Sequence, residues 1–270
     1  MERRYGWLPL QGMRISSFAH GILSLLVLTI LTACVPATKI PVDTVSYPYK
    51  AGARQECLIV FLPGRGAAVT DYDKEGFIDT ARQAGIRADM VSTDLHLGYY
   101  IDGTAFMRLR EDVIQPARSR GYVCIWLVGI SLGAYGALAY EVKYPGEITG
   151  LVLFAPYLGD KEIIDEISSA GSVKTWKPGS IAESDYQRKL WAWIKEYASK
   201  PHDSPVIYLG YGKKDRFARE DGLLAETLDS NRIITGPGIH AWTTWKPLWQ
   251  SLLNTEVGSG FLGVPKFQNP

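Results

Sequence analysis

The apolar run YVCIWLV at residues 122–128 leads without interruption into GISLG at residues 129–133. An apolar run of this length predicts a strand that is buried on both faces. The Gly- and Ala-rich segment that follows predicts a helix over residues 131–144, which ends before Pro145 because Pro cannot continue a helix. Ser131 is therefore expected at a sharp turn between a buried strand and a helix.

The rest of the chain continues this alternation. Strands are predicted at residues 56–62, 87–93, 122–128, 148–154, 205–209 and 232–235. Helices are predicted at residues 73–84, 104–119, 131–144, 183–198, 222–228 and 241–253. The pattern favours the α/β class, with a mostly parallel sheet and helices on both of its faces. Right-handed crossovers then place the carboxyl ends of the strands along one edge, where folds of this class bind ligands.

Residues 1–33 predict a secretory signal peptide. Three arginines precede a short apolar core at residues 22–31, and small residues follow it. This core is shorter than the roughly 20 apolar residues that a membrane span needs. A start at Met13 would give a more compact signal.

The end of the signal, LTAC at residues 31–34, resembles the lipobox of bacterial lipoproteins. The resemblance implies that Cys34 is lipidated, carries palmitate-like chains and becomes the first residue of the mature protein. Such an anchor would hold the chain on a membrane surface of the cell envelope without spanning it. A plain cleaved signal, or an uncleaved anchor, with Cys34 incidental is the alternative. Val35 after the cysteine favours, by the same resemblance, the outer over the inner membrane.

The mature chain divides into three parts. Residues 34–55 contain three prolines and predict a lipidated tether that leads into a first edge strand. Residues 56–255 predict the α/β domain, and residues 256–270 a peripheral tail. The formal charge is +1, or about −1 without residues 1–33, and no long run of Lys or Arg occurs. Nucleic acid is therefore not an expected partner, because phosphate binding needs a clustered basic surface.

Two cysteines, Cys57 and Cys124, fall at equivalent places in two predicted neighbouring strands. Cys57 stands seven residues before Gly64, and Cys124 stands seven residues before Ser131. The two cysteines could therefore be close in space. Two buried free thiols are the favoured interpretation, because free cysteine is among the most buried residue types. Export would permit a disulfide without requiring one.

The chemistry starts from residues 129–133, which match the pattern G-x-S-x-G. Alone the pattern is weak, but a strand that leads into it and a helix that leads out are the context that a nucleophile elbow requires. Ser131 is therefore the predicted nucleophile, with the positive end of the helix dipole directed at the reacting centre. A Gly-rich turn with an incidental serine is the alternative.

The segment GISLGAYGAL at residues 129–138, together with HAW at residues 240–242, resembles the α/β-hydrolase superfamily. The likeness extends over residues 56–253 and is nearest to the esterase branch that includes feruloyl and acetyl esterases. It implies an eight-stranded sheet, ester chemistry and no cofactor or metal. Pro63 departs from the family pattern, since many members carry His there. The interval 156–204 is where the superfamily often inserts a lid.

A serine needs a base to take its proton. His240, in the Gly-rich loop after the last predicted strand, is the predicted base, because the triad order of this fold is Ser, acid, His. His96 is expected in the pocket wall and His202 in an exposed loop. Asp215, after the strand at residues 205–209, is the predicted acid that orients the imidazole. Three other acids remain as substitutes: Asp160, Glu220 and Asp221.

An oxyanion hole needs two backbone N–H donors. Leu132, the residue after the nucleophile, and Arg65, in the loop PGRG after the first buried strand, are the predicted donors. The Arg65 side chain could also meet an anionic substrate or simply be solvated.

These residues predict a serine carboxylesterase that cleaves small or medium acyl esters through an acyl-enzyme on Ser131. A non-catalytic surface binding protein on the same fold is the alternative from another class, although all three triad members are present in order. The same triad could also serve acyl transfer to an alcohol, or thioester and amide hydrolysis. The aromatic residues of the lid interval could cover an apolar substrate or pack on the core: Trp176, Tyr186, Trp191, Trp193 and Tyr197.

Overall fold

A computed structural model describes residues 36–50, 52, 55–199 and 205–254 of the chain. The chain divides into two units, residues 1–37 and 38–270, and the following description concerns the second. The predicted signal peptide, the lipidation of Cys34, the loop position of His202 and the tail after residue 255 lie outside the described residues.

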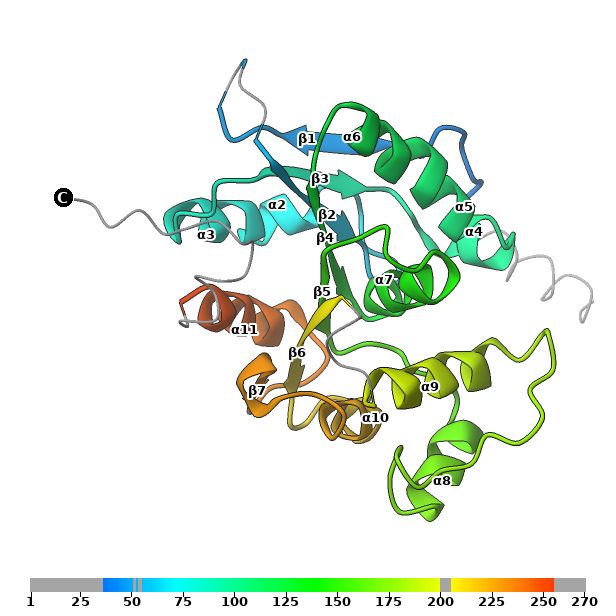
Figure 1. Ribbon diagram of the computed structural model, residues 1–270. Coiled ribbons are helices and arrows are strands. Elements are labelled where there is room, and N and C mark those ends of the chain that lie inside the picture. The colour runs from blue at the N-terminus through cyan, green and yellow to red at the C-terminus, as the bar shows by residue number, and fades with distance from the viewer. Residues whose placement is uncertain (1–35, 51, 53–54, 200–204, 255–270) are drawn as a thin grey trace, which may run out of the picture. The chain divides into compact units, whose positions relative to one another are not determined.

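A single sheet of seven strands forms the centre of this unit (Figure 1). The strands are β1 (Thr44–Tyr47), β2 (Cys57–Leu62), β3 (Asp89–Thr93), β4 (Cys124–Ile130), β5 (Gly150–Phe154), β6 (Val206–Gly212) and β7 (Ile233–Gly236). Their order across the sheet is β1-β3-β2-β4-β5-β6-β7. Only β1, the predicted edge strand, pairs antiparallel, and every other pairing is parallel. The α/β class is confirmed, with seven strands in the described residues against about eight expected from the resemblance.

Helices cover both faces of the sheet, as expected. The helices are α2 (Asp71–Lys74), α3 (Phe77–Gln83), α4 (Leu97–Ile101), α5 (Ala105–Leu109), η1 (Arg110–Ile114), α6 (Gln115–Ser119), α7 (Leu132–Lys143), α8 (Lys161–Ser169), α9 (Tyr186–Tyr197), α10 (Ala218–Ala225), η2 (Ser230–Arg232) and α11 (Trp242–Asn254). In Figure 1, α2, α3 and α11 lie on one side of the strands, whereas α5, α6, α7 and α9 lie on the other. No helix in the described part of the chain is both long and apolar enough to cross a membrane.

The strands separate two apolar cores. Alternate residues of β2 point to opposite sides, so Leu58, Val60 and Leu62 join one core while Ile59 and Phe61 join the other. Both sets are buried, which explains the continuous apolar run in the sequence. Full burial of each such side chain stabilises the fold by roughly 1.5–3 kcal/mol relative to exposure.

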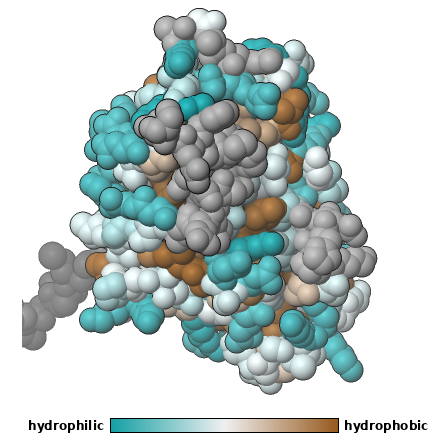
Figure 2. All heavy atoms as spheres, turned by 60° about the vertical axis from the view of Figure 1, so that its left-hand side comes forward, coloured by the Kyte–Doolittle hydropathy of each residue, from teal (hydrophilic) through white to brown (hydrophobic). Residues whose placement is uncertain are grey.

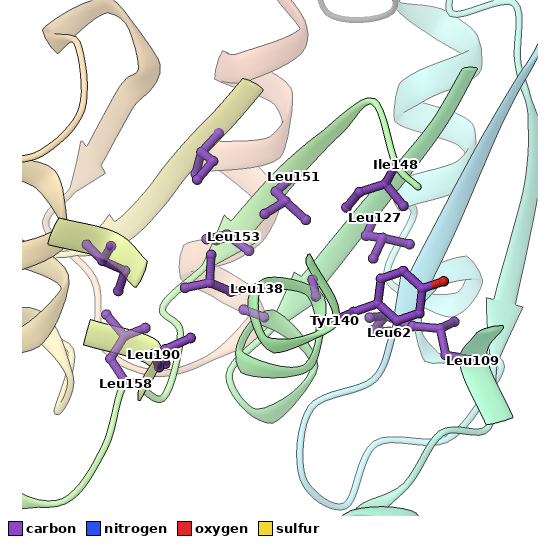
Figure 3. Close-up of a cluster of buried hydrophobic side chains, with 14 of the residues drawn as sticks. Leu62, Leu109, Leu127, Leu138, Tyr140, Ile148, Leu151, Leu153, Leu158 and Leu190 are labelled. Atoms are coloured by element: carbon purple, nitrogen blue, oxygen red, sulfur yellow. The ribbon is translucent and has the colours of Figure 1, made fainter. Parts of the chain in front are cut away.

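The larger core lies between α7 and the central strands. Figure 3 shows Leu138 and Tyr140 of α7 beside Leu127 of β4 and Leu151 and Leu153 of β5. In the view of Figure 2, mostly hydrophilic and neutral residues surround smaller apolar groups on the outer surface. The amphipathic division between core and surface therefore follows the expected pattern.

Some helices differ from the prediction. The helix expected at residues 73–84 is divided into α2 and α3 at Gly76, whose φ of 80° lies in the left-handed region. The helix expected at residues 104–119 contains a π-helical turn at η1. Two short helices, α4 and α8, were not predicted. The five residues of α4 are too few to show a helical period, whereas α8 is amphipathic, with Ile163, Ile164 and Ile167 buried, and its signal was overlooked.

Cys57 and Cys124 form a disulfide, so the favoured interpretation of two free thiols was wrong. They are register partners in the adjacent parallel strands β2 and β4, and their Cα atoms lie 4.4 Å apart. Composition could not reveal this, because a buried thiol and a buried disulfide suit the same apolar strand positions.

Candidate active site

Ser131 lies at the tip of the turn between β4 and α7, as predicted. Its φ of 55° and ψ of −115° are unusual for a residue with a side chain, at a cost of roughly 1–3 kcal/mol. Neighbouring backbone holds this conformation: Ser131 N donates to Phe154 O at 2.9 Å, and Ser131 O accepts from Tyr135 N at 3.0 Å. The strained turn projects the serine beyond the carboxyl end of β4, the geometry that a nucleophile elbow provides.

His240 and Asp215 form the contact that the sequence predicted. His240 Nδ1 lies 2.9 Å from Asp215 Oδ1 and 3.0 Å from Oδ2. The Asp215 side chain is fully buried, and the His240 side chain is 13% exposed. The contact leaves the other ring nitrogen, Nε2, as the atom that can exchange a proton with a neighbouring group.

The loops that carry this pair are fastened to one another. Lys213 N donates to Gly236 O at 2.7 Å and Lys214 N donates to Gly238 O at 3.0 Å. Phe217 N donates to Asp215 Oδ1 at 2.9 Å, which further orients the carboxylate. The loop after β6 and the loop after β7 are therefore joined by backbone hydrogen bonds from the two residues that precede Asp215.

Aromatic rings fix the plane of the imidazole. The His240 ring centroid lies 5.0 Å from that of Phe217 and 4.9 Å from that of Trp245, and both contacts are close to perpendicular. Neither aromatic residue was predicted to contact His240, so the sequence did not predict the orientation of the imidazole ring.

The substitute acids lie elsewhere. Asp160 is exposed and accepts from Tyr157 Oη at 2.6 Å and from Gln187 Nε2 at 2.7 Å. Asp221 is fully buried, and burial, together with the nearby Asp215 and Glu220, raises the pKa of its carboxyl well above the usual range. Of the predicted acids, Asp215 is the one that contacts His240.

The predicted oxyanion donors lie beside Ser131. A turn closes from Gly64 to Ala67, with Ala67 N donating to Gly64 O at 3.1 Å and Gly66 at a φ of 78°. A Cβ placed on Gly64 would be 3.7 Å from Ser131 Cβ, so this turn approaches the serine closely. Within the described residues, the backbone N–H groups of Arg65 and Leu132 have no acceptor. Two unsatisfied donors thus flank the serine, the requirement for an oxyanion hole.

Two cavities are lined by Ser131, and a third adjoins one of them. The nucleophile cavity, about 280 Å³, is lined by Gly64, Arg65, Ser131, Arg216, His240 and Trp242 among others. The bridging cavity, about 320 Å³, is lined by Arg65, Leu97, Ser131, Leu132, Tyr157, Arg216 and Phe217. The aromatic cavity, about 400 Å³, shares Leu97, Leu132 and Tyr157 with the bridging cavity and adds Tyr100, Phe106, Tyr135 and Tyr186. The shared lining residues make the three cavities neighbours along one depression that passes Ser131.

Other sequence expectations for the pocket need correction. His96 is buried, and its Nδ1 accepts from Gly98 N at 3.1 Å as the N-cap of α4, whereas its neighbour Leu97 lines the cavities. Among the aromatic residues of the lid interval, Tyr186 lines the aromatic cavity. The others pack on the core, with Trp176, Trp191 and Tyr197 buried and Trp193 half-buried. Arg216 was missed, although its position directly after Asp215 was a usable signal.

Solved structures with similar folds come from several bacteria. FphF of Staphylococcus aureus, described as a fluorophosphonate-binding serine hydrolase, is 12% identical with a TM-score of 0.55, over 79% of this chain and 97% of that one. Est1E from Butyrivibrio proteoclasticus is 14% identical with a TM-score of 0.56, over 81% and 94%. An S-formylglutathione hydrolase from Agrobacterium tumefaciens is 13% identical with a TM-score of 0.54, over 80% and 95%.

No protein-family model and no curated protein sequence matches the chain. At 12–14% identity, the structural likeness speaks for the fold and leaves the reaction to be argued from the site. The parallel sheet, the helices on both faces, the Ser131 turn and these neighbours together show that the chain has the α/β-hydrolase fold.

Proposed function

We propose that the protein is a serine hydrolase that cleaves carboxylic esters of small or medium acyl chains. The observation that carries the proposal is the bond between buried Asp215 and His240, in a cavity that His240 shares with the strained Ser131. A buried carboxylate bonded to an imidazole is unusual in a surface loop, and here the pair lies beside a serine held in a strained turn. The combination matches what nucleophilic catalysis by serine needs.

The proposed reaction has two stages. Ser131 Oγ attacks the ester carbonyl carbon while His240 Nε2 takes the hydroxyl proton, and Asp215 stabilises the imidazolium through Nδ1–H. The carbonyl oxygen becomes an oxyanion that accepts from the N–H groups of Arg65 and Leu132. The carbon–oxygen ester bond then breaks, and His240 returns its proton to the leaving alcohol.

The second stage repeats the first with water. Water loses a proton to His240 and attacks the acyl-enzyme, and Ser131 leaves with that proton as the carboxylic acid is released. The cavity sizes of about 280–400 Å³ suit substrates of modest size. If an alcohol entered in place of water, the same steps would give acyl transfer.

The test compares purified wild type with Ser131→Ala and with Ser119→Ala, an exposed serine at the end of α6. Hydrolysis of 4-nitrophenyl acetate, butyrate and octanoate is followed together with labelling by a fluorophosphonate probe. We expect both signals in wild type and Ser119→Ala, and neither in Ser131→Ala. If wild type neither turns over esters nor takes the label, the hydrolase proposal fails and a binding protein on this fold becomes the better account.

We also propose that the chain is exported and anchored by lipid on Cys34 to a membrane of the bacterial envelope, more consistent with the outer than the inner one. The support is in the sequence: the short apolar core at residues 22–31, the arginines before it and LTAC at residues 31–34. Metabolic labelling with an alkyne fatty acid should mark the wild-type chain and leave Cys34→Ala unmarked. Equal labelling of both would remove the anchor from the proposal.

A further inference from the structure

We propose that the physiological ester carries an anionic substituent, such as a carboxylate, which Arg65 and Arg216 bind beside Ser131. The inference rests on the proposed hydrolase function and narrows its substrate class. Both arginines line the nucleophile cavity and the bridging cavity, the two that contain Ser131. They come from different loops, after β2 and after β6, so the cation pair is assembled only by the fold.

The charges of both guanidinium groups are available to a ligand. Neither arginine has an ion-pair partner among the described residues, and both side chains are exposed to solvent. Several other arginines are engaged by carboxylates: Arg108 by Asp112, Arg110 by Glu147 and Arg188 by Glu166. The two arginines at the reacting serine therefore differ from these structural ones.

The acidic groups near the serine are already occupied. Asp71 also lines the nucleophile cavity, but it accepts from Ala68 N at 2.9 Å and lies 3.7 Å from Lys74 Nζ. The Asp215 carboxylate is buried against His240. No ion pair links either carboxylate to Arg65 or Arg216 in the described residues, so the two guanidinium groups can attract an anion and raise its local concentration.

One of the two guanidinium groups packs on an aromatic ring of the site. Arg216 Cζ lies 4.8 Å from the centroid of the Phe217 ring, which itself contacts His240. A cation held on an aromatic face loses less freedom when it binds a ligand. The planar guanidinium also matches the two oxygens of a carboxylate.

The aromatic cavity, which adjoins the bridging cavity, differs in character from the cavities that the arginines line. The aromatic cavity is lined by Tyr100, Phe106, Tyr135, Tyr157 and Tyr186 with little charge. An ester with a charged arm and an apolar arm would therefore meet matching surroundings in the arginine-lined cavities and in the adjoining aromatic cavity. A neutral apolar ester would leave the two cations without a partner.

The experiment uses charge-matched ester pairs on the purified protein. The first pair puts the charge in the leaving group: 4-acetoxybenzoate against 4-acetoxybenzamide. The second puts it in the acyl group: the mono-4-nitrophenyl ester of adipate against 4-nitrophenyl hexanoate. The quantity compared is the ratio of kcat/KM for the anionic ester to that for its neutral partner. A cation that only stabilises the oxyanion would change both members equally and leave this ratio unmoved.

We expect the wild-type ratio to be about tenfold or more in one of the pairs, as two charge-assisted contacts allow. The double variant Arg65→Gln/Arg216→Gln should bring it to within about twofold of unity, whereas Arg120→Gln, an exposed arginine after α6, should keep it. Salt at about 0.5 M screens charges and should reduce the wild-type ratio severalfold. This measurement needs no substitution, so it remains informative if the double variant folds poorly.

A binding measurement separates the two proposals. Ser131→Ala is titrated with 4-hydroxybenzoate and 4-hydroxybenzamide, and the change in total tryptophan fluorescence is followed, since Trp242 and Trp245 line the cavity. Ester turnover without charge preference in either pair, or a preference unchanged in the double variant, overturns this inference and leaves the hydrolase intact. If wild type hydrolyses none of the esters but 4-hydroxybenzoate still binds selectively and through the two arginines, the anion site is supported and the hydrolase proposal is overturned.

Discussion

Gly133, in the first turn of α7, packs directly against the backbone carbonyl of Leu62, the last residue of β2. A Cβ on Gly133 would overlap the Leu62 carbonyl and approach Pro63 O to 2.7 Å. The second glycine of the GISLG motif thus lets the helix after the nucleophile reach the strand that precedes the Arg65 turn. This contact joins the two halves of the candidate oxyanion hole.

Gly133→Ala should destabilise the protein by about 2–3 kcal/mol, because backbone atoms on both sides must move to admit one methyl group. Gly222→Ala is the matched control: Gly222 lies inside α10, and a Cβ there would meet nothing within 4 Å. That variant should be stabilised by about 0.5–1 kcal/mol through helix propensity. Urea unfolding monitored by circular dichroism measures both. Equal stability of the two variants would contradict the close packing.

Asp215→Asn should lower kcat by roughly 10³–10⁴-fold, because the amide cannot hold the imidazole in the required tautomer or stabilise its charged form. Asp160→Asn removes the substitute acid, which is bonded to Tyr157 and Gln187 and not to His240. Its kcat should stay within a few-fold of wild type. Loss of activity in Asp160→Asn alone would show that the acid was assigned to the wrong loop.

The disulfide should be measurable as both a mass and a stability difference. Cys57 and Cys124 are 67 residues apart in sequence, and closure of a loop of that length stabilises a fold by up to about 4 kcal/mol. Non-reducing peptide mapping should recover the two cysteine peptides joined. Cys57→Ala/Cys124→Ala should unfold at lower urea concentration than the oxidised wild type, and reduction should abolish most of that difference. Separate peptides in freshly purified protein would disprove the link.

Glu141 should make stability fall as pH rises. This α7 residue is buried, Oε1 accepts from Gly146 N at 3.0 Å, and Oε2 has no partner in the described residues. Burial raises the pKa of its carboxyl from 4.5 to about 7. The folded state therefore holds the proton more tightly than the unfolded state, and stability is lost as pH rises from about 4.5 through 7.

Glu141→Gln keeps an acceptor for Gly146 N and cannot ionise. Relative to wild type it should gain roughly 2–3 kcal/mol between pH 4.5 and 8, since one pKa unit corresponds to about 1.4 kcal/mol. Denaturant unfolding at both pH values gives this difference. The exposed Glu162→Gln on α8 serves as control and should show no such gain. A parallel pH dependence in Glu141→Gln and wild type would assign the effect to another group.

Much of this architecture could be predicted from local patterns. The apolar runs at residues 56–62 and 122–128 correspond to β2 and β4, since strands buried on both faces need apolar residues at every position. The proximity of Ser131, Asp215 and His240 could be predicted because each follows a predicted strand, and parallel strands bring their carboxyl ends together. Asp160 also lies between Ser131 and His240 in the chain, and Asp215 was preferred because it follows the penultimate predicted strand.

What could not be predicted depends on contacts between distant segments. His96 was expected in the pocket wall, yet its side chain caps α4. Tryptophans of the lid interval look suited to a substrate cover, but Trp176 and Trp191 fill the core. The pairing of Arg65 with Arg216 across the nucleophile cavity depends on the approach of two loops about 150 residues apart, which no local pattern encodes.

The cross-link between β2 and β4 also determines how these strands can be aligned. Cys57 faces Cys124 at one end of the strand pair, and Leu62 faces Gly129 at the other. A slip by one residue would shift the Arg65 turn by about 3.3 Å relative to Ser131, more than the length of the hydrogen bond that an oxyanion donor must make. The disulfide joins β2 and β4 at the opposite end from Ser131 and prevents such a shift in register. The distance between the nucleophile and the Arg65 donor is thereby kept constant by a bond that lies outside the reacting centre.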